Sequence, residues 1–221
     1  MSTPREPTAA GMAVRTALIL FIFVVVFTAV LAGAYLFTRP AIEASAIAEK
    51  MKLITEVLPA GSYDNALLED TLTMPPTPAL GLDQPSTIYR ARQGKADVAL
   101  VLEAVAPDGY AGKIRLLIAV WADGRIAGIR VTQHKETPGL GDYIDAKKDK
   151  VKSRPWISQF NDQSFTTVAK EAWQLKKDGG HFDYYAGATV SARAVTKAVG
   201  KALEFATTHR EQLFAREGKT P

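Results

Sequence analysis

One long apolar run dominates the first part of the chain. Residues 16–37 are 22 positions of mainly Leu, Ile, Val, Phe and Ala, without a single Asp, Glu, Lys, Arg or His. As an α-helix this run is about 33 Å long, close to the roughly 30 Å thickness of the hydrocarbon core of a bilayer. The pattern predicts one uncleaved transmembrane helix over residues 16–38, with a cleaved signal peptide or a buried core helix as alternatives.

The pattern then changes to an amphipathic one. Residues 42–58 have apolar side chains at helical spacing with Glu and Lys between them, and Pro59 follows directly. This predicts a helix that continues from the membrane as a stalk and ends before the proline. Four prolines between residues 71 and 85 predict an extended connector or surface excursion. Residues 39–85 are therefore expected to be a helical stalk and a Pro-rich connector.

The strongest strand pattern lies in the middle of the chain. Residues 97–106, 113–121 and 125–133 are rich in Val, Ile and Leu. An Asp-Gly pair lies between each run and the next, so the three runs are predicted to form an antiparallel meander. A shorter run at residues 87–92 is expected to add an edge strand.

The last regular pattern is helical. Apolar residues recur at intervals of three and four from Val190 to about Phe214, which predicts one long C-terminal helix. Residues 165–175 fit either a strand or a helix. The predicted fold class is therefore α+β, with a domain over residues 86–221 that follows the membrane helix and its stalk.

Composition excludes several classes of function. The chain has no cysteine, which removes disulfides, cysteine zinc sites, iron–sulfur ligation and thiol nucleophiles. Beyond residue 39 it has 24 Lys and Arg against 22 Asp and Glu, so a nucleic-acid partner is not expected. The three histidines are far apart, and no metal site or catalytic triad is predicted.

One segment with candidate binding chemistry follows the third strand of the meander. It reads Glu136-Thr137-Pro138-Gly139-Leu140-Gly141-Asp142. Two glycines beside a leucine predict a tight loop that exposes the backbone and turns Leu140 outward, where it can receive a flat ligand. The alternative is an ordinary turn at the end of a strand.

A second segment comes directly before the C-terminal helix. It reads Asp183-Tyr184-Tyr185-Ala186-Gly187-Ala188-Thr189. Gly187 and Ala188 allow a ligand to approach the backbone, and the start of a helix favours an anion such as phosphate. Thr189 is expected at the N-cap, where its hydroxyl could contact that anion or simply cap the helix.

Together the two segments resemble the FMN-binding domain of the RnfG and NqrC type. That family has the pattern Asp-x-x-(Ser/Thr)-Gly-Ala-Thr, which this chain matches at Asp183, Gly187, Ala188 and Thr189, with Ala186 as the one departure. The similarity covers nearly the whole chain, and the RnfG type fits better than the NqrC type.

The resemblance implies a function and a set of site residues. It implies that FMN is attached to Thr189 by a phosphoester bond that a dedicated flavin transferase makes, and that the protein carries electrons in the Rnf complex between ferredoxin and NAD. The other residues implied to contact FMN are Asp183, Gly187, Ala188, Val190, Glu136, Thr137, Pro138, Gly139, Leu140 and Gly141. No independent active site is expected.

The resemblance also implies partners and a location. The partners are the A, B, C, D and E subunits of the Rnf complex, the flavin transferase and membrane lipid. Residues 1–15 are expected in the cytoplasm and the FMN domain in the periplasm, anchored to the inner membrane by a single span. The alternatives are an NqrC-like component of the sodium-translocating quinone reductase, or a cofactor-free membrane-anchored binding module.

A basic run lies between the two segments. Its members are Lys147, Lys148, Lys150, Lys152 and Arg154. It is predicted to be a solvated helix face, with docking to an acidic partner or to anionic lipid headgroups as the alternative.

Overall fold

The computed structural model describes residues 8–215. These divide into two compact units, one up to Lys50 and one from Met51 onward. The first unit belongs to helix α1 (Ala9–Val57), whose most apolar stretch has a mean hydropathy of 2.9. The predicted apolar helix is confirmed, and it has the length and composition to cross a membrane.

Helix α1 continues through the predicted stalk without a break. Pro40 lies inside it, and the helix ends two residues before Pro59, as its sequence predicts. Side chains of the stalk at Ile42 and Ile47 are exposed, whereas Ile54 and Val57 at the end of α1 are buried in the second unit.

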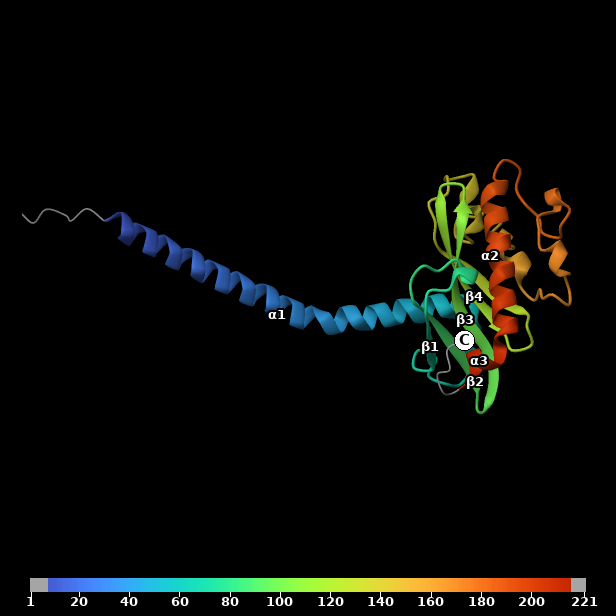
Figure 1. Cartoon of the computed structure of the whole chain (residues 1–221), viewed down its shortest axis with the longest axis horizontal. Coiled ribbons are helices and arrows are strands. Elements are labelled where there is room, and N and C mark those ends of the chain that lie inside the picture. Colours follow the sequence, from blue (N-terminus) through green and yellow to red (C-terminus); the bar gives the residue numbers. More distant parts are fainter. Residues whose placement is uncertain (1–7, 216–221) are drawn as a thin grey trace, which may run out of the picture. The chain divides into compact units, whose positions relative to one another are not determined.

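The second unit contains one five-stranded antiparallel sheet in chain order (Figure 1). Its strands are β1 (Thr71–Met74), β2 (Ser86–Gln93), β3 (Ala96–Gly109), β4 (Gly112–Trp121) and β5 (Ile126–Gln133). The predicted meander and the strand before it are confirmed.

The turn between β3 and β4 differs from its prediction. The Asp108-Gly109 pair was expected to form the turn, but β3 extends through Gly109 and the turn comes at Tyr110 and Ala111. A shift in register between Ala106 and Gly109 accommodates the extra residues of this strand. This longer hairpin brings Tyr110 to the candidate site described below.

The Pro-rich segment is more than a connector. Residues 71–74 form β1 and pair with β2, and Pro78–Leu80 form a short 3-10 turn. Leu72, Met74, Leu80 and Leu82 from this segment are buried in the core. The prolines exclude an α-helix, as predicted, but the buried apolar residues before and between them pack the segment into the core with the sheet.

Two layers of apolar side chains cover the two faces of the sheet. Helix α2 (Thr189–Thr208) packs against β3 and β4 on one face, as Figure 1 shows. On the other face the end of α1 contributes Ile54 and Val57, and Leu58 directly after the helix joins them. Burial on both faces explains why β3 and β4 read as nearly continuous apolar runs.

The C-terminal helix is interrupted. Helix α2 ends at Thr208, and the short α3 (Arg210–Phe214) follows after His209. The predicted helix over residues 190–214 is therefore two helices, of which α2 begins one residue earlier than expected.

Between β5 and α2 the chain forms turns and short 3-10 segments. These segments are Gly141–Ile144, Trp156–Phe160, Lys170–Ala172 and Lys176–Asp178. Residues 165–175 are thus neither strand nor α-helix. The region contains a cluster of buried aromatic rings in contact with one another, formed by Trp156, Phe160, Trp173 and Phe182. Contacts between these rings, rather than the backbone hydrogen bonds of a sheet or an α-helix, stabilise this part of the chain.

The basic run lies on an exposed loop, not on the helix face that its sequence predicted. Its anchor is Asp149, which is fully buried. The Asp149 carboxylate accepts hydrogen bonds from the backbone N–H groups of Val151 and Trp156 and from the Tyr185 hydroxyl. This network holds the loop against the segment that leads to Thr189.

Candidate functional site

A cavity of about 310 Å³ brings together the two segments that the sequence singled out. Most of the predicted residues line it, and two further ones join them. The lining residues are Tyr110, Glu136, Thr137, Leu140, Gly141, Gly187, Ala188, Thr189, Val190 and Ser191. The 136–141 loop and the start of α2 are about 50 residues apart in the sequence. They form one site only because the fold brings them together.

Three predicted residues do not line the cavity. Pro138 and Gly139 lie in the same loop as the lining residues, and Gly139 donates its backbone N–H to the Asp142 carboxylate at 2.9 Å. The Asp183 side chain is exposed and pairs with Lys176 at 2.7 Å, while its carbonyl accepts the Trp156 indole N–H at 2.6 Å. Asp183 thus anchors the chain upstream of the cavity, and its contact with a cofactor stays a prediction.

Thr189 is the first residue of α2, not its N-cap. The N-cap is Ala188, and no side chain caps this end of the helix. The expected N-cap position of Thr189 is therefore wrong, and so is the alternative that its hydroxyl only caps the helix. The first turn contains no acidic residue, so its N–H groups and the positive end of the helix dipole suit a phosphate group.

Gly187 shapes the approach to this helix. Its φ is +88°, a conformation that residues with a side chain rarely adopt. A Cβ built at Gly187 would meet no atom within 4 Å. The positive φ of the turn into α2, and not a lack of space, therefore requires the glycine.

The cavity has an apolar surface exposed to solvent. Beyond residue 57, four large apolar side chains in the described part of the chain are exposed, and Tyr110, Leu140 and Val190 are three of them. They are 72%, 55% and 42% exposed, and all three line this cavity. Such a grouping suits the face of a flat, largely apolar ring.

Tyr143 holds the segment before Thr189 in place through two hydrogen bonds of its hydroxyl. Its hydroxyl donates to the carbonyl of Ala188 at 3.2 Å and accepts the backbone N–H of Tyr185 at 3.4 Å. The rings of Tyr143 and Tyr185 lie 4.3 Å apart. Burial raises the pKa of Tyr143 to about 12, although the Tyr185 N–H opposes this. The hydroxyl therefore keeps its proton at physiological pH and can donate it to Ala188.

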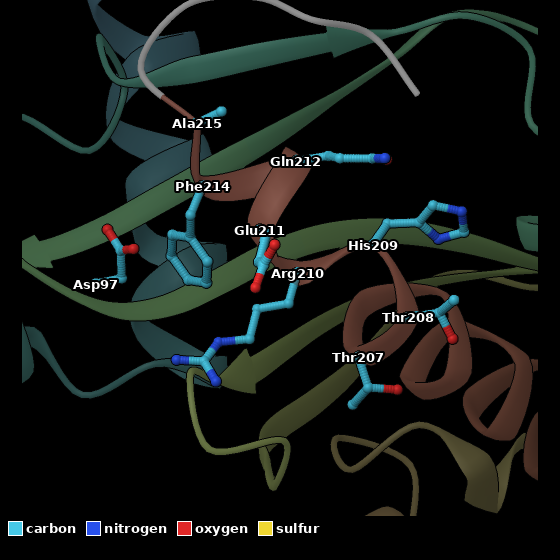
Figure 2. Close-up of a pocket in the computed structure, with 9 residues that line it drawn as sticks. All are labelled: Asp97, Thr207, Thr208, His209, Arg210, Glu211, Gln212, Phe214 and Ala215. Carbon is cyan, nitrogen blue, oxygen red and sulfur yellow. The ribbon is translucent and has the colours of Figure 1, made fainter.

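A larger cavity, of about 730 Å³, lies at the other end of α2. Figure 2 shows its lining by Thr207 to Gln212, Phe214 and Ala215, with Asp97 of β3 on the side of Phe214. None of the residues singled out by the sequence lines it. Size alone would select this cavity, but the chemistry favours the smaller one, which combines the apolar side chains with Thr189 at the start of α2.

Sequence reasoning missed Tyr110 and Ser191. Tyr110 lies in a turn whose position was predicted one or two residues too early. Ser191 reads as an ordinary helical residue, although a serine in the first turn of a helix that starts with Gly-Ala-Thr was a detectable signal.

Two family models match the chain. A family model described as the FMN-binding domain matches residues 109–204, which contain every residue that lines the smaller cavity. A second model, described as the RnfG N-terminal region, matches residues 10–57, nearly the whole of α1.

Relatives match along nearly the whole chain as well. The chain is 43% identical over 203 residues to the G subunit of the ion-translocating oxidoreductase complex of Pseudomonas aeruginosa strain UCBPP-PA14, covering 92% of each chain. It is 37% identical to the corresponding G subunit of Pseudoalteromonas atlantica, over 91% of each chain. The Vibrio cholerae O395 protein is 36% identical, over 90% of this chain and 92% of its own. The chain therefore belongs to the family of G subunits of ion-translocating oxidoreductase complexes, and it has the FMN-binding domain of that family.

Proposed function

We propose that this protein is the electron-carrying G subunit of an Rnf complex, and that it holds FMN through a phosphoester bond to the hydroxyl of Thr189. One observation carries the proposal. Thr189 lines the same cavity as residues of the 136–141 loop, at a helix start that no side chain caps. A phosphate joined to Thr189 would lie beside the unpaired N–H groups of α2.

Different residues of the cavity would bind different parts of FMN. The first turn of α2 would hold the phosphate end, and Tyr110, Leu140 and Val190, which line the cavity, would contact the ring and exclude water from it. FMN supplies the redox chemistry when bound, because it can take up and release electrons. The protein's part in electron transfer is to fix the position and the exposure of the ring, and this transfer requires no side chain as an acid, base or nucleophile.

The wider assembly is inferred from the family. The relatives are named as subunits of an ion-translocating oxidoreductase complex. We infer that this chain works with the A, B, C, D and E subunits of the Rnf complex in electron transfer between ferredoxin and NAD. A flavin transferase would load Thr189 during maturation.

The proposed location is the periplasmic side of the inner membrane, with the N-terminus in the cytoplasm. Helix α1 supports a single span. A covalent bond suits this location, since a dissociated FMN would be lost where no pool replaces it. Protease added to spheroplasts should digest the part of the chain beyond residue 50. Protection until the membrane is lysed would contradict the periplasmic location.

The attachment site can be tested because the cavity offers two threonines. Protein coexpressed with a flavin transferase is separated by denaturing electrophoresis, and covalent flavin is detected by its fluorescence. Thr189→Val removes one hydroxyl and keeps the shape of the side chain, so the fluorescent band should disappear. Thr137→Val is the matched control on the opposite loop and should keep the flavin.

Mass spectrometry of the peptides decides the outcome. Flavin on the peptide that contains residue 189 is expected for the wild type and for Thr137→Val. Flavin that persists on Thr189→Val would contradict the assignment. An unlabelled wild type, under conditions where a homologue is labelled, would contradict covalent attachment itself.

A further inference from the structure

The floor of the proposed FMN site contains a buried carboxylate that FMN chemistry does not require. Glu136 is only 4% exposed, although it lines the cavity. Its two oxygens accept hydrogen bonds from different elements. The Ser191 hydroxyl donates to Oε2 at 2.5 Å, and the backbone N–H of Ala111 donates to Oε1 at 3.2 Å.

Two glycines make room for this carboxylate. A Cβ at Gly109 would lie 2.8 Å from Glu136 Oε1, and a Cβ at Gly141 would lie 2.9 Å from Oε2 and 2.8 Å from Ser191 Oγ. These separations are shorter than real Cβ contacts. A side chain at either glycine would have to displace the Glu136 carboxylate, and at Gly109 its Cβ would also lie 2.3 Å from the carbonyl oxygen of Gly112.

The three segments that meet at Glu136 are the ones that bear the exposed apolar side chains of the cavity. Tyr110 precedes Ala111 in the β3–β4 turn, Leu140 lies in the loop of Glu136 itself, and Val190 precedes Ser191 in α2. A single carboxylate thus connects the three segments that carry these side chains, through the Ala111 backbone N–H and the Ser191 hydroxyl.

We propose that Glu136 is a positioning residue that, through Ser191 and Ala111, fixes Tyr110, Leu140 and Val190 as the walls of the flavin ring site. This inference rests on the proposed function for the identity of the ring. The hydrogen bonds join residues of the chain to one another, so the positioning role can be measured before and after FMN is attached.

The first test uses the full-length protein in detergent before flavin is attached. Amide hydrogen exchange reports on the Ala111 N–H, which donates directly to Glu136. In Glu136→Ala this amide should exchange roughly five to ten times faster, the ratio expected for the loss of one hydrogen bond. In Glu136→Gln exchange should stay near the wild-type rate, because the amide can accept from Ala111 and donate to Ser191 Oγ.

The second test uses protein that carries FMN on Thr189, as verified by mass. A ring held in one orientation gives a visible circular dichroism band, and Tyr110 beside it quenches its fluorescence. Glu136→Ala, Ser191→Ala and Gly141→Ala should weaken the band and raise the fluorescence without removing the flavin. Glu136→Gln should restore the wild-type spectrum.

Ser164→Ala is the matched control. Ser164 is a buried serine with a hydrogen-bonded hydroxyl that does not line the cavity. Its replacement should lower stability without changing either the flavin spectrum or exchange at Ala111.

The outcomes separate the two proposals. A wild type without flavin on Thr189 contradicts the proposed function, and exchange at Ala111 then still decides whether Glu136 ties the segments together. A flavinylated wild type whose spectrum and Ala111 exchange are unchanged in Glu136→Ala would overturn the positioning role. Equal changes in Ser164→Ala would reduce that role to general stability.

Discussion

Replacing Asp70 by Asn should destabilise the domain far more than breaking an exposed ion pair of the same length. Asp70 accepts hydrogen bonds from the Nε atoms of Arg90 and Arg92 at 2.6 and 2.7 Å. Both arginines are buried, and Asp97 pairs with Arg92 as the second carboxylate. The same guanidinium groups donate to the carbonyl oxygens of residues 214–215. The cluster therefore ties the sheet to the chain beyond α2, the helix that begins at Thr189.

The magnitude follows from the charge balance of the cluster. Two arginines face two aspartates, so the substitution leaves one buried positive charge without a partner. Removal of one member of a fully buried pair costs about 3–5 kcal/mol. The Asp70 side chain is 26% exposed, so solvent screens part of this, and we expect a loss of about 2–3 kcal/mol. For a domain of this size, that lowers the Tm by roughly 5–10 °C.

Thermal unfolding of the full-length protein in detergent, followed by circular dichroism, measures the effect. Asp83→Asn is the matched control because Asp83 and Lys113 are also 2.6 Å apart, with side chains 76% and 60% exposed. The control should not change the Tm measurably. An equal Tm for Asp70→Asn and the wild type would refute the reasoning that burial, not distance, gives this pair its strength.

The same cluster predicts a dependence on pH. Burial of Asp70 opposes its ionisation, but the hydrogen bonds and charges of Arg92 and Arg90 outweigh it and lower the pKa below 3.8. When the pKa of Asp70 is lower in the folded state than in the unfolded state, its carboxylate stabilises the folded protein at pH values above the unfolded-state pKa. This stabilisation is lost as the pH falls through the folded-state pKa. The difference in stability between wild type and Asp70→Asn should therefore be constant near pH 7 and shrink below about pH 4. A difference that grows on acidification would contradict this sign.

Two further predictions concern the ring site and the core. Leu140→Asp should lower the midpoint potential of the attached FMN in a redox titration, because a carboxylate beside the ring disfavours the added negative charge of reduction. The control is Val151→Asp, which places a carboxylate at an exposed apolar position outside the cavity. Equal potentials in the two variants would show that Leu140 is not part of the ring site. Gly128→Ala should lower stability by about 1–3 kcal/mol in thermal unfolding, since its Cβ would lie 2.5 Å from the carbonyl oxygen of Val57 at the end of α1. Gly61→Ala, whose Cβ would meet nothing within 4 Å, should leave the Tm unchanged, and a similar loss in both variants would contradict the close approach of helix and strand.

Helices and strands with a clear repeat of apolar residues could be predicted, because that repeat is contained in a short stretch of sequence. The apolar run of α1, the apolar runs of β3 to β5 and the helical spacing of α2 are each contained in one window of the sequence. Errors came where a distant contact decided the local structure. Residues 71–74 look like part of a Pro-rich connector and become β1 only because β2 offers them a partner. The Asp108-Gly109 pair is typical of a turn, yet the pairing of β3 with β4 extends through it.

The candidate site shows the same division. The sequence by itself determined which two segments matter, because Glu136 to Gly141 and Gly187 to Thr189 carry unusual residue types at fixed spacing. It could not show that they face each other, that Tyr110 joins them, or that Ser191 donates to Glu136. A helix period or a turn motif depends on the few residues beside it. A cavity depends on side chains that only the packing of α2 on the sheet brings within reach, and that packing is decided by the whole core at once.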